Sequence, residues 1–146
     1  MQSIENRVKN RIYGHGRGWA CLPADFQDIG NTNSIHNALH SLRRQGIIRR
    51  VARGVYDYPK LHSELGELSP RPEDVAKAIA RQDKARIQPV GAYAANLLGF
   101  TTQVPGNIVF LTDRRSRTIK LGKRTLSLKK VSPKKMAAAG RTSGLL

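Results

Sequence analysis

Three arginines surround a predicted hairpin turn in the first half of the chain. Arg49, Arg50 and Arg53 precede Gly54 in a stretch rich in β-branched and aromatic residues. A guanidinium group can pair with phosphate or enter a minor groove, so this spacing is typical of a wing that lies along DNA. The alternative is that these arginines are only solvated on a small hairpin.

A helix-forming segment, residues 33–45, comes immediately before this hairpin. Its apolar residues recur at three- and four-residue intervals and predict one buried face: Ile35, Ala38, Leu39 and Leu42. The other face carries hydrogen-bonding and basic groups: His36, Asn37, His40, Ser41, Arg43 and Arg44. Asn can bond adenine bidentately and Arg can bond guanine, so this face is a candidate reader of bases, with plain solvation as the alternative. Asn31, Thr32 and Asn33 are expected to cap the helix, to bond phosphate, or both.

Catalytic and metal-binding patterns find little support. His36 and His40 stand four residues apart, but no Cys, Asp or Glu lies close in sequence to complete a metal site. Cys21 stands in an apolar stretch, which favours a place in the core. The few carboxylates are typical of caps and surface groups. We therefore expect no enzymatic activity, no metal and no cofactor.

The elements around these residues predict the first domain. We expect a helix over 3–13 that ends at Gly14, a short strand over 19–22, and a second helix from Pro23 to Gly30. The helix 33–45 and a hairpin over 46–59 follow, with Gly54 in the turn. Helix, strand, helix, helix and hairpin is the order of a winged helix-turn-helix, predicted here for residues 1–62.

The second domain is predicted over residues 73–146, after a linker at 60–72 that ends in Leu-Ser-Pro-Arg-Pro. Its expected elements are helices at 73–82 and 90–98, a strand at 107–112, and a hairpin of strands 118–121 and 125–128. The predicted fold class is therefore α+β: a winged helix-turn-helix followed by a small α/β domain with a basic β-hairpin.

Positive charge dominates the composition. The chain has 146 residues, and 26 Lys and Arg against 10 Asp and Glu give a net charge of +16. Such an excess favours a polyanionic partner, in the first place nucleic acid. Most of it, +10, lies after His62. An auxiliary basic patch is expected to extend a DNA footprint or to dock an acidic protein, with a solvated face as the third reading: Arg114, Arg115, Arg117, Lys120, Lys123, Arg124, Lys129 and Lys130.

The sequence also gives expectations for the location and the oligomeric state of the protein. The sequence has no apolar run long enough to span a bilayer, no signal peptide and one cysteine, so we expect a cytoplasmic, nucleoid-associated protein with no membrane partner. A monomer in solution that binds DNA cooperatively is compatible with the sequence. The tail from Met136 to Leu146 starts like a helix and ends without a helix stop, so we expect a shortened chain.

The order of several short motifs resembles the AbiEi-like antitoxin and transcriptional-regulator family of bacterial type IV toxin–antitoxin systems. These motifs are Arg-Gly-Val-Tyr at 53–56, the helix Gly-Ala-Tyr-Ala-Ala-Asn-Leu-Leu-Gly at 91–99, Thr-Gln-Val-Pro at 102–105 and Ile-Val-Phe-Leu-Thr at 108–112. The resemblance covers the whole chain. Members of that family often continue for some tens of residues beyond this point.

The resemblance implies a DNA-binding autorepressor and antitoxin. In that family the winged helix binds inverted repeats in its own promoter, and the second domain counteracts a co-encoded nucleotidyltransferase-like toxin. By position, the DNA role falls on the helix 33–45 and the wing 47–58. The alternative is a basic adaptor that docks an acidic partner or toxin without sequence-specific DNA binding. An RNA-binding module is disfavoured because aromatic residues are only 5% of the chain.

Overall fold

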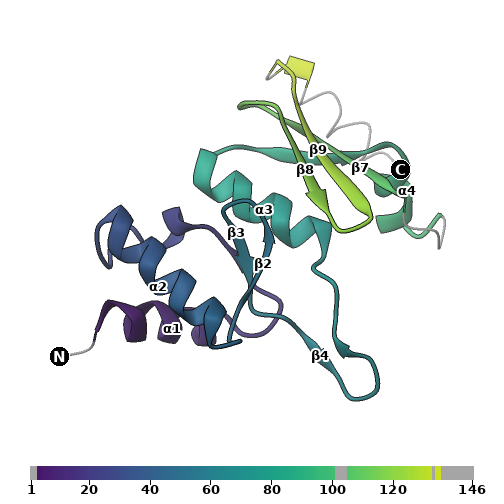
Figure 1. Ribbon diagram of the computed structural model, residues 1–146. Coiled ribbons are helices and arrows are strands. Elements are labelled where there is room, and N and C mark those ends of the chain that lie inside the picture. The colour runs from purple at the N-terminus through teal and green to yellow at the C-terminus, as the bar shows by residue number, and fades with distance from the viewer. Residues whose placement is uncertain (1–2, 101–104, 133, 136–146) are drawn as a thin grey trace. The chain divides into compact units, whose positions relative to one another are not determined.

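A computed structural model describes residues 3–100, 105–132 and 134–135 (Figure 1). In this part of the chain four α-helices, one 3-10 helix and three small sheets form a mixed α+β protein. The α+β class is therefore confirmed. The chain divides into two compact units, Met1–Ala78 and Ile79–Leu146, and the division falls within helix α3, Pro72–Asp83.

Two amphipathic helices that pack against each other supply most of the core of the first unit. Helix α1, Ile4–His15, and helix α2, Thr32–Arg44, lie side by side (Figure 1). The Ser3 side chain caps α1 by accepting from the backbone N–H of Asn6 at 3.1 Å. The apolar faces of both helices meet in one cluster of buried residues: Val8, Ile12, Cys21, Phe26, Ile29, Ile35, Ala38, Leu39, Leu42 and Ile48. Cys21 is 1% exposed, which confirms its predicted place in the core.

The segment between the two helices differs from the expectation. Strand β1, Ala20–Cys21, is confirmed, but an α-helix from Pro23 to Gly30 is wrong. The residues form a 3-10 helix, Pro23–Phe26, followed by turns. Backbone bonds from Asp25 to Leu22 and from Ile29 to Phe26 span three residues. Three residues per turn place Phe26 and Ile29 on one side, and both are buried.

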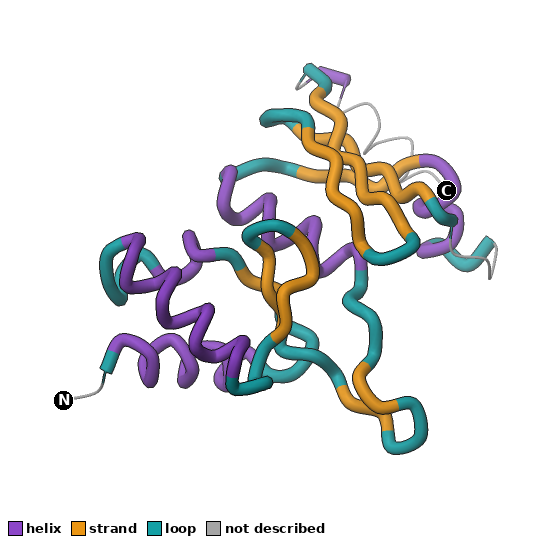
Figure 2. The backbone as a smooth tube through the Cα atoms, in the orientation of Figure 1, coloured by secondary structure: helices purple, strands orange, loops and turns teal. Residues whose placement is uncertain are grey.

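Strands β2, Arg49–Ala52, and β3, Val55–Asp57, form the predicted hairpin (Figure 2). With β1 they make a three-stranded sheet in the order β1-β3-β2. Gly54 has a φ of 73°, which lets the chain reverse without steric strain. The register shifts between Arg50 and Ala52, so Arg49 lies directly opposite Asp57.

The predicted linker contains a second, smaller hairpin. Strands β4, Leu61–His62, and β5, Gly66–Glu67, pair antiparallel and are exposed. The His62 ring nitrogen Nδ1 accepts from the backbone N–H groups of Glu64 and Leu65, at 3.1 and 3.2 Å. These local hydrogen bonds explain why a turn forms here. Strands of two residues are too short to give a periodic pattern that would predict them from the sequence.

The second unit is built on a four-stranded sheet in the order β6-β7-β9-β8. Strand β7, Asn107–Thr112, pairs in parallel with β9, Arg124–Lys130, and β8, Arg117–Leu121, pairs antiparallel with β9. The strand at 107–112 and the hairpin are thus confirmed. One sheet face supplies buried core side chains: Ile108, Phe110, Leu121, Leu126 and Leu128. Tyr93 of helix α4, Gly91–Leu97, reaches this core, with its ring centroid 5.7 Å from that of Phe110.

Strand β6, Ile87–Val90, is the one strand of this sheet that the sequence does not predict. Its third residue, Pro89, has no N–H to donate and argues against a central strand. The strand stands at the edge of the sheet, where one side of its backbone needs no partner. Helix α3 confirms the predicted helix at 73–82 within one residue at each end. The predicted helical tail and most of the Thr-Gln-Val-Pro motif lie outside the described residues.

Candidate nucleic-acid interface

Helix α2 is held at its start by the side chain of Asn31. The Asn31 carboxamide oxygen accepts from the backbone N–H of Ser34 at 2.8 Å. This bond satisfies one of the amide groups that a helix start leaves without an internal partner. Thr32 and Asn33 follow as exposed residues of the first turn. Capping by Asn31 is therefore confirmed, and exposed N–H groups at this end suit an anion.

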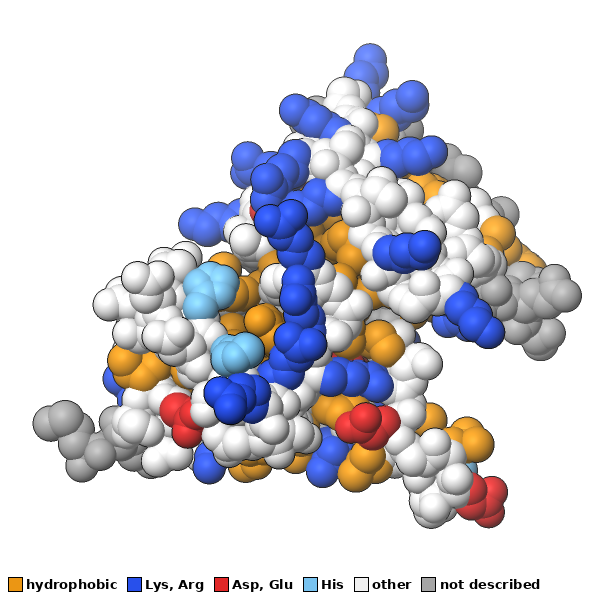
Figure 3. Space-filling view, viewed as in Figure 1, with side chains coloured by type: hydrophobic (Ala, Val, Ile, Leu, Met, Phe, Trp, Pro, Cys, Tyr) orange, Lys and Arg blue, Asp and Glu red, His pale blue; other side chains and the backbone are white. Residues whose placement is uncertain are grey.

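The outward face of α2 gathers the predicted base-reading side chains. Asn33, His36, Asn37, His40 and Arg44 recur at the spacing of one helical face, opposite the buried Ile35, Ala38, Leu39 and Leu42. All five are exposed, and so is Arg43. Ser41 is half-buried at the margin, where its hydroxyl accepts from the Gln45 amide at 3.1 Å. Figure 3 shows His, Lys and Arg side chains gathered over α2 and the β2–β3 hairpin.

The three arginines of the hairpin have different surroundings. Arg50 and Arg53 are exposed, on β2 and in the turn. Arg49 is half-buried, and its guanidinium donates to both carboxylate oxygens of Asp57, at 2.8 and 3.0 Å. It also donates to the backbone oxygen of Leu68. Arg49 thus connects the start of β2 to the end of β3 and to the segment that follows the hairpin. Arg50 and Arg53 instead extend into solvent.

Asp57 is a buried carboxyl group whose charge depends on Arg49. The residue is 2% exposed. Burial raises the pKa of Asp57 above its ordinary value, and the bonds and charge of Arg49 oppose that rise. The same bonds raise the pKa of Arg49. A bidentate pair with a buried partner fixes the orientation of the guanidinium.

The basic residues of the second unit lie on the β8–β9 hairpin and on the loop before it. Six of the eight predicted members are exposed: Arg114, Arg115, Lys120, Lys123, Lys129 and Lys130. Arg117 and Arg124 are half-buried. Arg117 approaches Asp83 at the end of α3 at 3.4 Å, and Arg115 approaches the same carboxylate at 3.7 Å. The predicted patch is thus divided: Arg115 and Arg117 approach Asp83, Arg114 lies on the loop, and the other members are on β8, β9 and their turn.

Within the described part of the chain, no cluster of three or more His, Cys, Asp or Glu could hold a metal ion. His36 and His40 are both exposed on α2. No helix among the described residues has the length and apolar character needed to cross a membrane.

A comparison with known protein families gives a match over nearly the whole chain. Residues 7–146 match a family described as a family of unknown function, DUF6088. The chain belongs to the DUF6088 family. Neither curated proteins nor solved structures gave a match.

Two ion-pair partners in this DUF6088 protein were not singled out from the sequence. Asp57 and Asp83 each position an arginine of a basic hairpin. Asp57 stands in the predicted hairpin, so its alternation with Val55 could have shown that its side chain points inward. Asp83 comes from a helix 34 residues before Arg117, and no local pattern connects the two.

Proposed function

We propose that the first unit is a winged helix-turn-helix that binds double-stranded DNA. The observation that carries this proposal is the exposed face of α2, with Asn37, His40 and Arg44, next to a hairpin that projects Arg50 and Arg53. Amide and guanidinium groups are the side chains that bond base edges bidentately. Arginines beside the reading helix would contact phosphate and fix its register.

The element order supports the same assignment. Helix α1, strand β1, the 3-10 helix, helix α2 and the β2–β3 hairpin follow one another as in a winged helix, with α2 as the recognition helix. The 3-10 helix at Pro23–Phe26 takes the place of the usual second helix and packs against α2. An α-helix fits within the major groove of B-DNA, and α2 has a whole face clear of the core to insert.

We further propose that the protein is an autorepressor and antitoxin of a bacterial toxin–antitoxin system. The resemblance of several short motifs to the AbiEi-like family supports this step. The winged helix would bind inverted repeats in the promoter of its own operon. The second unit would contact a co-encoded nucleotidyltransferase-like toxin.

The test is fluorescence anisotropy with a labelled duplex from the region upstream of the gene and a scrambled duplex of equal composition. We expect tighter binding to the native duplex and a steep fall of log affinity with log salt concentration. Replacing Arg50 and Arg53 by Ala should weaken binding to both duplexes. Arg7→Ala, which removes an exposed charge from α1, is the matched control and should change binding little.

Base reading is tested separately from phosphate contact. Asn37→Ala and His40→Ala should reduce the preference for the native duplex while retaining binding to the scrambled one. Equal binding of the parent protein to the two duplexes, or binding unchanged by the Arg50 and Arg53 substitutions, would overturn the winged-helix proposal.

A second candidate function is a basic adaptor that docks an acidic protein. The charge distribution favours it: residues 79–146 carry 14 Lys and Arg against 2 Asp and Glu, whereas residues 1–78 carry 12 against 8. Most of the excess charge therefore lies outside the proposed reading unit. Co-expression with the neighbouring gene product tests this candidate. A one-to-one complex with weak, non-specific DNA binding would favour the adaptor over the repressor.

A further inference from the structure

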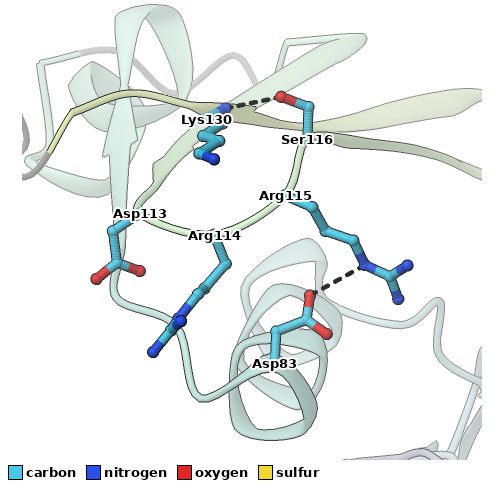
Figure 4. Close-up of a pocket in the computed structure, with 6 residues that line it drawn as sticks. All are labelled: Asp83, Asp113, Arg114, Arg115, Ser116 and Lys130. Atoms are coloured by element: carbon cyan, nitrogen blue, oxygen red, sulfur yellow. Dashed lines mark hydrogen bonds and ion pairs between the residues drawn. The ribbon is translucent and has the colours of Figure 1, made fainter.

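A cleft of about 490 Å³ lies in the second unit where β7 and β9 end (Figure 4). The two strands run in parallel, and Thr112 at the end of β7 pairs with Lys130 at the end of β9. The loop from β7 to β8 forms one wall and the last residue of α3 another. The residues that line the cleft are Asp83, Asp113, Arg114, Arg115, Ser116 and Lys130.

Hydrogen bonds hold the wall of this cleft in place. The backbone N–H of Lys130 donates to the Ser116 hydroxyl at 2.9 Å, and that of Arg114 donates to the Thr112 hydroxyl at 3.2 Å. The backbone N–H of Arg86 donates to Asp113 at 2.8 Å. The loop is therefore tied to both parallel strands and to the chain before β6. A tied loop loses little conformational freedom when a ligand binds.

The two carboxylates of the cleft already have partners. Asp83 is approached by Arg115 and Arg117, at 3.7 and 3.4 Å. Asp113 accepts the backbone bond from Arg86. The guanidinium of Arg114 makes one long contact, from Nε to the backbone oxygen of Lys84 at 3.4 Å. The Lys130 ammonium pairs with no carboxylate among the described residues, and Figure 4 shows its side chain extending toward the cleft.

We propose that this cleft binds the phosphate group of a phosphorylated ligand about the size of a mononucleotide. Arg114 offers a planar fork of donors and Lys130 a compact charge, and each of these groups attracts a phosphate dianion. The volume falls within the range of ligand pockets, about 300–1,000 Å³. The phosphate is supplied either by a free nucleotide or by the backbone of a nucleic acid. None of the residues that line this cleft belongs to the proposed winged helix.

Neighbouring lysines on β9 provide a matched pair of variants. Side chains alternate between the two faces of a strand, so Lys129 and Lys130 point in opposite directions and only Lys130 lines the cleft. Lys130→Gln and Lys129→Gln remove the same charge from adjacent exposed positions. Arg114→Gln tests the second cationic group independently.

Isothermal titration calorimetry of the full chain with AMP, inorganic phosphate and adenosine tests the proposal. We expect saturable binding of AMP and phosphate and weaker binding of adenosine. Lys130→Gln and Arg114→Gln should each weaken AMP binding about tenfold or more, which is the range for a hydrogen bond to a charged group. Lys129→Gln should leave it within about twofold, because its charge is solvated and screened. Unfolding temperatures check that the variants stay folded.

Three results would overturn the phosphate site: no saturable AMP or phosphate binding, equal binding of adenosine and AMP, or equal losses in Lys129→Gln and Lys130→Gln. Competition with duplex DNA identifies the source of the phosphate. Displacement of AMP by the duplex would assign the cleft to the nucleic-acid backbone, whereas simultaneous binding would assign it to a free nucleotide. AMP binding should persist in the Arg50 and Arg53 variant, so this site and the winged helix can fail separately.

Discussion

The two basic hairpins of this protein use an aspartate in different ways. In β2–β3 the aspartate is in the hairpin itself: Asp57 lies opposite Arg49 across the strands and is almost fully buried. In β8–β9 the hairpin has no acid, and Arg117 relies on Asp83 from the end of α3. The first pair is a short bidentate contact and the second is a looser one at 3.4 Å.

This comparison distinguishes basic residues that form ion pairs within the fold from basic residues that are free to contact a partner molecule. Arg49 and Arg117 both stand at the start of a basic hairpin, and both are committed to a carboxylate. The cations farther along each hairpin, such as Arg53 and Lys123 in the two turns, have exposed side chains. A count of basic residues therefore overstates the charge that is open to a polyanion, and more so for β2–β3.

The largest expected effect is loss of the buried pair. Arg49→Ala should lower the free energy of unfolding at neutral pH by about 3 kcal/mol, because it leaves a buried carboxylate without its partner. Without Arg49 the pKa of Asp57 should rise further, since the bonds that lower it are gone. The protonated carboxyl needs no counter-charge, so the loss should shrink as the pH falls below that pKa. Urea unfolding at several pH values measures both.

Arg50→Ala is the control for this prediction, because it removes a neighbouring arginine that is exposed. Its effect on stability should stay within about 0.5 kcal/mol. A loss from Arg49→Ala that is equally small, or independent of pH, would contradict a structural role for the Asp57 pair.

The second prediction compares the exposed cations of the two hairpins on DNA. If β2–β3 is the wing, replacing Arg50 and Arg53 by Ala should reduce affinity about ten- to thirtyfold and reduce the salt slope by about 2. Replacing Lys120 and Lys123 of β8–β9 should change the slope less. Equal changes in slope, measured by anisotropy titrations from low to physiological salt, would mean that both hairpins lie on the DNA.

The third prediction concerns the looser pair. Asp83→Ala should lower the free energy of unfolding by about 1 kcal/mol, less than Arg49→Ala, because the Asp83 carboxylate is more exposed than that of Asp57 and its contact is longer. Double-mutant cycles with Arg117→Ala measure the coupling. A coupling as large as that between Arg49 and Asp57 would remove the distinction between the hairpins.

The sequence predicts the parts of this fold that rest on periodicity. The apolar spacing of α2, the apolar run of β7 and the alternation in β9 predict those elements to within two residues at each end. Phe26 and Ile29 stand three residues apart, and this spacing fits both an α-helix and a 3-10 helix, so the sequence does not distinguish the two. The pairing of Arg49 with Asp57 depends on a register shift between Arg50 and Ala52, and the sequence has no signal for that bulge. The cleft at Lys130 depends on the parallel pairing of β7 with β9, a contact between distant segments.

The smallest expected effect is at an exposed pair of the first unit. Arg11 donates to both oxygens of Asp28, at 2.6 and 2.7 Å, and chiefly through these bonds the pKa of Asp28 falls from 3.8 to about 2. A lowered carboxyl pKa stabilises the fold above the unfolded pKa, and this contribution is lost as the pH falls toward 2. Asp28→Asn should therefore lower the melting temperature slightly at pH 7. The difference should vanish as the pH falls below about 2, whereas the pKa of Asp57 is raised above its ordinary value.

The two outer strands of the four-stranded sheet have a consequence for aggregation. An edge strand offers unpaired backbone groups onto which another chain can add, and that addition is the first step toward strand-linked polymers. In the described sheet one edge is β6, in which Pro89 removes a donor, and the other is β8, which carries Arg117 and Lys120. A missing N–H in β6 and the exposed charge of Lys120 in β8 both disfavour addition of an identical strand. The same residues that make the sheet basic and interrupt its edge therefore help to keep the protein dispersed at high concentration.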